Sequence, residues 1–178
     1  MSTVFLVVGL PAAGKSTRAR ELERGGALRL TTDEWVVPVF GGQNPEAGRD
    51  ALEGQLIRTA LEVARRGVDV VLDFGFWSRD ERTALRALFA DAGARCVVEF
   101  CDVAPDVQRA RVQQRWRERP HTTFPIGEDE LETWRGRFET PGVDELAPSF
   151  SPPRWADWAD WTARRWPGYA GWGPPPRL

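Results

Sequence analysis

A glycine-rich loop near the amino terminus places the strongest constraint on how this chain can fold. Residues 9–16 read Gly-Leu-Pro-Ala-Ala-Gly-Lys-Ser, which is the pattern Gly-x4-Gly-Lys-Ser. The apolar, β-branched run Val4–Val8 precedes it and predicts a buried strand, and Lys15–Arg24 follows it with the spacing of a short helix. A strand, a loop of this pattern and a helix together predict a phosphate-binding loop.

Such a loop binds phosphate mainly through its backbone. The amides of residues 13–17 are expected to turn inward, where a phosphate also meets the positive end of the following helix. Lys15 is expected to reach the β- and γ-phosphates of a nucleotide, and the Ser16 hydroxyl to bind Mg²⁺. We therefore predict ATP and Mg²⁺ as cofactors, with the nucleotide held by Gly9, Pro11, Ala12, Ala13, Gly14, Lys15, Ser16 and Thr17.

Lys15 is also the only lysine of the chain, although lysine and arginine together number 24. A coding bias towards arginine accounts for the scarcity of lysine elsewhere. The one ammonium that remains stands where a compact point charge and a planar guanidinium are not interchangeable.

Strands and helices alternate along the first two-thirds of the sequence, which predicts a three-layer α/β fold with a mainly parallel sheet of four to five strands. No convincing fifth strand is visible in the sequence, and residues 35–45 are interpreted as a loop because they mix aromatic residues, Pro and Gly without a period. The expected strands are 4–8, 27–31, 68–72 and 95–103, and the expected helices are 15–24, 49–66, 78–91, 105–117 and 128–138.

Two aspartates follow predicted strands, at the edge of the sheet where ligands bind in open α/β folds. Asp33 is the candidate catalytic base, because a carboxylate beside the attacking oxygen can accept the proton of a hydroxyl. Asp73 ends the run Val-Val-Leu-Asp, the form of an element that holds magnesium. The alternatives are a helix or turn cap for Asp33 and a turn aspartate for Asp73.

Several function classes are excluded by the residues. A Ras-type GTPase needs an Asn-Lys-x-Asp motif, which a chain with one lysine in its loop cannot contain. Gly41-Gly42-Gln43 resembles part of an ABC ATPase signature but comes too early in the chain. A net charge of −2 argues against nucleic acid as the default partner, without excluding it. The absence of a long apolar run and of a signal peptide predicts a cytoplasmic protein without membrane association.

The sequence resembles the small P-loop kinases grouped with zeta toxins, chloramphenicol phosphotransferase and gluconate kinase. The resemblance covers residues 3–145 and rests on residues 9–17, Thr32-Asp33, the run Val-Leu-Asp-Phe-Gly-Phe-Trp-Ser-Arg-Asp-Glu-Arg at 71–82 and the arginine-spaced helix after the fourth strand. It implies that Asp33 is the base of the acceptor. It also implies that arginines contact the phosphates or the acceptor at Arg79, Arg82, Arg111, Arg115 and Arg119.

The last three of these arginines are four residues apart and share one face of a helix. We expect a short lid at about residues 115–127 that brings Arg115 to the transferring group and Arg111 and Arg119 to the nucleotide. The alternative is a solvated helix flank. Residues 1–147 are interpreted as the kinase domain, and residues 148–178 as a Trp- and Pro-rich extension that packs on it or forms an aromatic pocket or partner surface.

The sequence thus predicts an ATP- and Mg²⁺-dependent kinase that phosphorylates a hydroxyl of a small molecule, with antibiotics, sugars and nucleosides as candidate acceptors. Asp33, Trp35, Phe40, Trp77, Arg79 and Arg82 are the predicted acceptor residues. Two alternatives stay open: a kinase of polynucleotide 5′ ends, and a non-catalytic protein that uses ATP as a switch.

Overall fold

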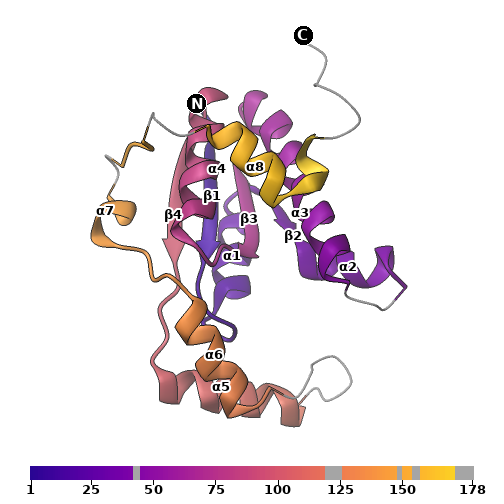
Figure 1. Cartoon of the computed structure of the whole chain (residues 1–178), viewed down its shortest axis with the longest axis vertical. Helices are drawn as coiled ribbons and strands as arrows, with labels where there is room; N and C mark the ends of the chain where they lie inside the picture. The colour runs from indigo at the N-terminus through magenta and orange to yellow at the C-terminus, as the bar shows by residue number, and fades with distance from the viewer. Residues whose placement is uncertain (42–44, 119–125, 148–149, 154–156, 171–178) are drawn as a thin grey trace.

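The computed structural model describes residues 1–41, 45–118, 126–147, 150–153 and 157–170. It is an α/β structure that begins with a strand and ends in helical segments (Figure 1). The elements in chain order are β1 Thr3–Val8, α1 Lys15–Arg24, β2 Leu28–Thr31, α2 Thr32–Val39, α3 Glu46–Arg65, β3 Val70–Gly75, α4 Arg79–Asp91, β4 Arg95–Phe100, α5 Pro105–Glu118, α6 Glu128–Arg137, α7 Val143–Leu146, α8 Trp158–Arg165 and the 3₁₀ helix η1 Pro167–Ala170.

The described strands form one four-stranded sheet in the order β2-β3-β1-β4, and every pair is parallel. This confirms the predicted fold class. Because all strands run the same way, their carboxyl ends lie at one edge of the sheet. The strand arrows point to this edge in Figure 1, and helices α5 and α6 form an arm beyond it.

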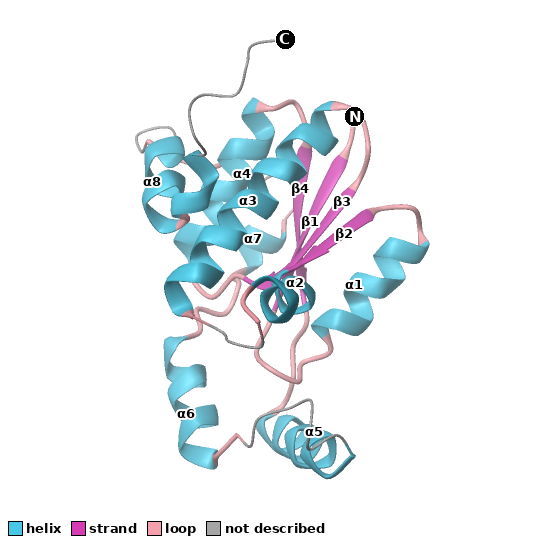
Figure 2. Cartoon of the chain, turned by 90° about the vertical axis from the view of Figure 1, so that its right-hand side faces the viewer, coloured by secondary structure: helices cyan, strands magenta, loops and turns pink. Residues whose placement is uncertain are grey.

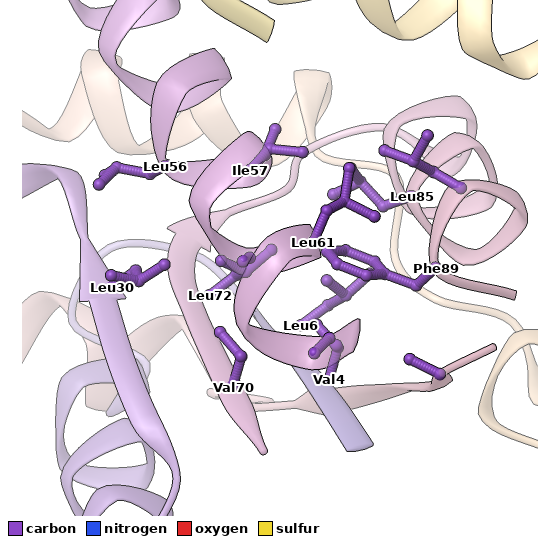
Figure 3. Packing of buried hydrophobic residues seen from close by; sticks show 14 of the residues in the cluster. Val4, Leu6, Leu30, Leu56, Ile57, Leu61, Val70, Leu72, Leu85 and Phe89 are labelled. Atoms are coloured by element: carbon purple, nitrogen blue, oxygen red, sulfur yellow. The ribbon is translucent and has the colours of Figure 1, made fainter. Parts of the chain in front are cut away.

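Helices cover the two faces of the sheet, with α1 on one side and α3 and α4 on the other (Figure 2). On the α3 and α4 face, alternate residues of β1 and β3 such as Leu6 and Leu72 pack against Ile57, Leu61 and Phe89 (Figure 3). Val7 and Val71 point the opposite way and pack with Ala19 of α1. Successive side chains of β1 point to opposite faces of the sheet, so helices can pack on both faces and the protein has three layers.

The segment after β2 differs from the expectation that residues 35–45 form a loop. It starts with helix α2, whose first turn carries Asp33 and Glu34, where the positive end of the helix stabilises carboxylates. Pro38 lies in the last turn, so only one backbone donor is lost before the helix ends at Val39. Asp33 is therefore held on a helix rather than on a loop.

The carboxy-terminal helices pack on the α3 and α4 layer (Figure 2). Trp166 is 1% exposed and belongs to the main hydrophobic core, where its ring meets Phe76 edge to face. The structure thus places this tryptophan in the core. Among the described residues, no helix combines the length and apolarity that spanning a bilayer requires.

Arg82 lies inside the protein and not at a substrate site, which contradicts its predicted role. The side chain is fully buried, and its Nε and Nη2 donate to the two carboxylate oxygens of Glu145 at 2.8 and 3.0 Å. A third bond goes to the carbonyl oxygen of Phe76 at 3.2 Å. Arg82 therefore fastens α7 to α4.

Glu145→Gln is expected to lower the free energy of unfolding by about 3–5 kcal/mol, because it leaves the buried guanidinium of Arg82 without a countercharge. Urea denaturation measures the change. Asp144→Asn is the matched control, since the neighbouring Asp144–Arg79 pair is solvent-exposed on both sides and should contribute far less. Equal effects of the two substitutions would contradict the structural role given to the Arg82–Glu145 pair.

Candidate active site

The glycine-rich loop joins β1 to α1 at the carboxyl edge of the sheet. Gly14 caps α1 with φ 102°, a conformation that favours glycine, and its carbonyl accepts bonds from the amides of Thr17 and Arg18. A Cβ on Gly9 would lie 2.5 Å from the carbonyl oxygen of Cys101, so only glycine lets β1 and the end of β4 approach this closely. The loop pattern read from the sequence therefore has the conformation of a phosphate-binding loop.

Lys15 lies at the centre of the charged groups of this edge. Its Nζ donates to the carbonyl oxygen of Leu10 at 2.9 Å, inside the loop. Burial lowers the pKa of Lys15, while the carboxylates of Asp73 and Asp33 act in the opposite direction. Lys15 therefore places a partly buried ammonium inside the loop.

Asp73 lies within β3 rather than after it, paired in register with Thr31. Burial raises the pKa of the Asp73 carboxyl, and the charge of Lys15 and a hydrogen bond from the Ser16 hydroxyl counteract the shift. The carboxylate also lies 3.8 Å from Nη1 of Arg29. A carboxylate and a hydroxyl side by side are oxygen ligands of the kind that Mg²⁺ prefers, so the residues fit this ion.

Asp33 is on the first turn of α2, with its side chain 74% exposed. Its Oδ1 accepts a bond of 2.8 Å from Nη2 of Arg49. The Asp33 charge raises the pKa of Asp73 and acts on that of Lys15 as well. The structure therefore brings the three predicted groups together, and Asp33 is the member open to solvent.

A cleft of about 730 Å³ runs along the outer side of the loop, between the first turns of α1 and helix α5. Arg111 and Arg115 line it together with Ala12, Ser16 and Thr17. Nη1 of Arg111 donates to the Ala12 carbonyl at 3.2 Å, and the Arg115 charge contributes to the lowered pKa of Lys15. Two of the three spaced arginines thus face the loop, while Arg119 and residues 119–125 of the expected lid lie outside the described residues.

Trp77 lies next to the loop on the sheet side. A Cβ on Gly75 would be 3.4 Å from the indole nitrogen of Trp77 and 3.8 Å from Cε of Lys15, so both side chains flank this glycine. The indole also packs edge-on against Trp134 and Phe138, with ring centroids 6.4 and 6.2 Å apart. These aromatic rings connect α6 to the carboxyl edge of the sheet.

The remaining predicted acceptor residues are exposed or contact other parts of the chain. Trp35 is exposed on α2, two residues beyond Asp33 and thus about half a turn away on the helix. Phe40 packs over Gly48 at the start of α3. Arg79 forms an exposed ion pair with Asp144.

The sequence interpretation missed several side chains that contact the loop, the two aspartates or one another. Arg29 approaches Asp73, and Arg49 binds Asp33. Gln108 of α5 is fully buried, donates to the carbonyl oxygen of Pro11 at 2.7 Å and accepts a bond from Arg135. The Arg49–Glu53 pair has the i, i+4 spacing that could have indicated its importance, whereas nothing in the sequence marks Gln108.

Comparison with known proteins identifies the family of the chain and proteins of similar fold. Residues 4–141 match the family model AAA_33, described as an AAA domain. No curated protein matches the chain. A protein of Chloroflexus aurantiacus j-10-fl that has been suggested to be a kinase superposes with a TM-score of 0.65 at 19% identity, covering 92% of this chain and 98% of its own.

Two further solved structures carry more specific descriptions. A sugar kinase from Janibacter sp. HTCC2649 has a TM-score of 0.58 at 17% identity, with 82% of each chain covered. The APS kinase CysC of Mycobacterium tuberculosis, solved with AMPPNP and APS, has a TM-score of 0.56 at 17% identity, with 92% of this chain and 94% of that chain covered. At these identities the likeness concerns the fold. The chain belongs to the AAA_33 family and has the fold of the small P-loop kinases.

Proposed function

We propose that the protein is an ATP- and Mg²⁺-dependent kinase that transfers the γ-phosphoryl group to a hydroxyl of a small molecule. The observation that carries this proposal is the position of Asp33. A solvent-open carboxylate lies at the same sheet edge as the loop lysine and the buried Asp73, close enough to influence the pKa of both. A nucleotide-binding switch has no need of such a group, whereas a kinase needs a base for the hydroxyl.

The roles of the residues follow from their places. Lys15 and the loop amides hold the β- and γ-phosphates, and Ser16 with Asp73 holds Mg²⁺, which neutralises phosphate charge when bound. Asp33 takes the proton of the acceptor hydroxyl as its oxygen bonds to the γ-phosphorus, and the bond from that phosphorus to the β–γ bridging oxygen breaks to release ADP. Arg115 stabilises the negative charge on the transferring group.

The acceptor is expected to contact the aromatic rings beside the loop. Trp77 and Trp134 offer flat apolar faces, which suit a sugar ring, a nucleoside or an aromatic antibiotic. The similarity to a sugar kinase and an APS kinase supports a small acceptor. The net charge of −2 argues against a polynucleotide end, which would favour a basic groove.

An ADP-release screen tests the proposal. The full chain is incubated with ATP and Mg²⁺ and with sugars, nucleosides, aminoglycosides, phenicols and oligonucleotides bearing free 5′ ends, and Lys15→Ala serves as the inactive control. One class of small hydroxyl compound should raise ADP release well above hydrolysis by water. Stimulation by oligonucleotides alone would replace the proposed acceptor class, and no stimulation by any compound would favour the switch.

A further inference from the structure

Residues outside the family match reach the centre of the protein. Trp166 lies 25 residues beyond residue 141, where the match ends, yet its indole Nε1 donates to Oε2 of Glu53 at 3.0 Å in the core. Glu53 is itself only 6% exposed. A buried carboxylate requires partners, and one of these comes from the carboxy-terminal segment, residues 157–170.

The other oxygen of Glu53 faces the catalytic edge. Oε1 lies 3.3 Å from Nε of Arg49 and 3.5 Å from the hydroxyl of Thr32, the residue before Asp33. Arg49 then donates to Asp33 from its Nη2 at 2.8 Å. A continuous line of polar contacts therefore runs from Trp166 through Glu53 and Arg49 to the proposed base.

The carboxy-terminal segment is fixed to α3 at close range. A Cβ on Gly168 would overlap the carbonyl oxygen of Ala51, and a Cβ on Gly54 would overlap the backbone of Tyr169. Arg165 binds Asp50 at 2.8 Å from Nη1 and Glu81 at 2.7 Å from Nε. These contacts fix the indole of Trp166 relative to the helix that carries Glu53 and Arg49.

We propose that Glu53 and Trp166 are positioning residues for Asp33, so that the carboxy-terminal segment completes the active site. This inference rests on the proposed role of Asp33 as base. An exposed aspartate on a two-turn helix can take several rotamers, and a long arginine orients it only if the arginine is itself held. Glu53 holds Arg49 by charge, and Trp166 holds Glu53 by its N–H group.

Trp166→Phe tests the inference because it removes the N–H donor and keeps most of the buried ring. Hydrogen exchange of the amides in residues 32–39 is expected to accelerate, while exchange in α1 stays unchanged. ADP release from MgATP, with water as the acceptor, is expected to fall roughly tenfold, within the range that a small misplacement of a reacting group can cost. The affinity for MgATP should stay within about twofold, since no contact to the phosphate loop is altered.

Trp161→Phe is the matched control, because Trp161 packs edge-on against Trp166 with ring centroids 6.0 Å apart. It should leave exchange and ADP release at wild-type values. Glu53→Gln is the second variant: it keeps the volume and an oxygen for the indole but puts an amide against Arg49. It should reproduce both effects of Trp166→Phe, so a folding defect particular to one substitution does not decide the outcome.

A double-mutant cycle separates this inference from the proposed function. If Trp166 acts through Asp33, Trp166→Phe lowers ADP release in the wild type but has no further effect in Asp33→Asn. An equal effect in both backgrounds overturns the inference, and so does unchanged exchange in residues 32–39. If Asp33→Asn itself leaves ADP release unchanged with water and with any acceptor found, the role of Asp33 as base fails instead.

Discussion

Lys15→Met is expected to abolish phosphoryl transfer. The substitution keeps a long side chain but removes the only ammonium in the loop, whose Nζ is held at the Leu10 carbonyl and surrounded by Asp73 and Asp33. Turnover should fall by at least roughly 10²- to 10³-fold, the cost of losing one preorganised group that stabilises developing charge. ADP release in the presence of saturating MgATP measures the fall, and calorimetry measures the accompanying loss of MgATP affinity.

Lys15→Arg distinguishes charge from shape. The guanidinium keeps the positive charge but is planar and larger than the ammonium, so it should not fit the loop and should be almost as inactive as methionine. Arg66→Met, at the exposed carboxyl end of α3, is the control for loss of a cation and should have wild-type turnover. Full activity of Lys15→Arg would show that any cation suffices at this position.

Asp33→Asn is expected to lower the rate of transfer to the acceptor by roughly 10²- to 10⁴-fold, the usual contribution of a general base. The amide is nearly the same size and can still accept a hydrogen bond from Arg49, so the local structure should persist. Single-turnover measurements with radiolabelled ATP and an acceptor identified in the screen isolate the chemical step. MgATP affinity should change little, because Asp33 is proposed to contact the acceptor.

Asp91→Asn provides the matched control, since Asp91 is exposed at the carboxyl end of α4, far along the chain from the loop. Its turnover should equal that of the wild type. If Asp33→Asn retains wild-type transfer, Asp33 is not the base, and its carboxylate serves only to bind Arg49.

The sequence was most informative where one local rule determines the structure. The phosphate loop and the alternation of strands and helices were predicted, and the structure confirms them. Each depends on residues a few positions apart, whose spacing is visible in a single sequence. Asp33, Lys15 and Asp73 could be brought together because parallel strands end at a common edge.

The predictions were wrong where residues far apart in the sequence determine the structure. The family resemblance implied that Arg82 contacts the phosphates or the acceptor, but Glu145, 63 positions away, forms a buried ion pair with it. Residues 35–39 of α2 were interpreted as part of a loop because residues 35–45 mix aromatic residues, Pro and Gly without a period. A proline near the end of a helix removes only one backbone bond, so Pro38 does not prevent the helix. The three polar contacts that connect Trp166 to Asp33 join residues that are 113, four and 16 positions apart in the sequence. No periodicity in the sequence reveals such a combination.

The bond between Trp166 and Glu53 also has a consequence for the order of folding. The two residues are 113 positions apart, so a chain growing from its amino terminus forms the phosphate loop and most of the sheet long before Glu53 can meet its indole partner. Until then the Glu53 carboxylate lacks its indole donor, and burying it would cost free energy. The nascent chain therefore contains every residue of the phosphate loop well before the contact between Glu53 and Trp166 can form.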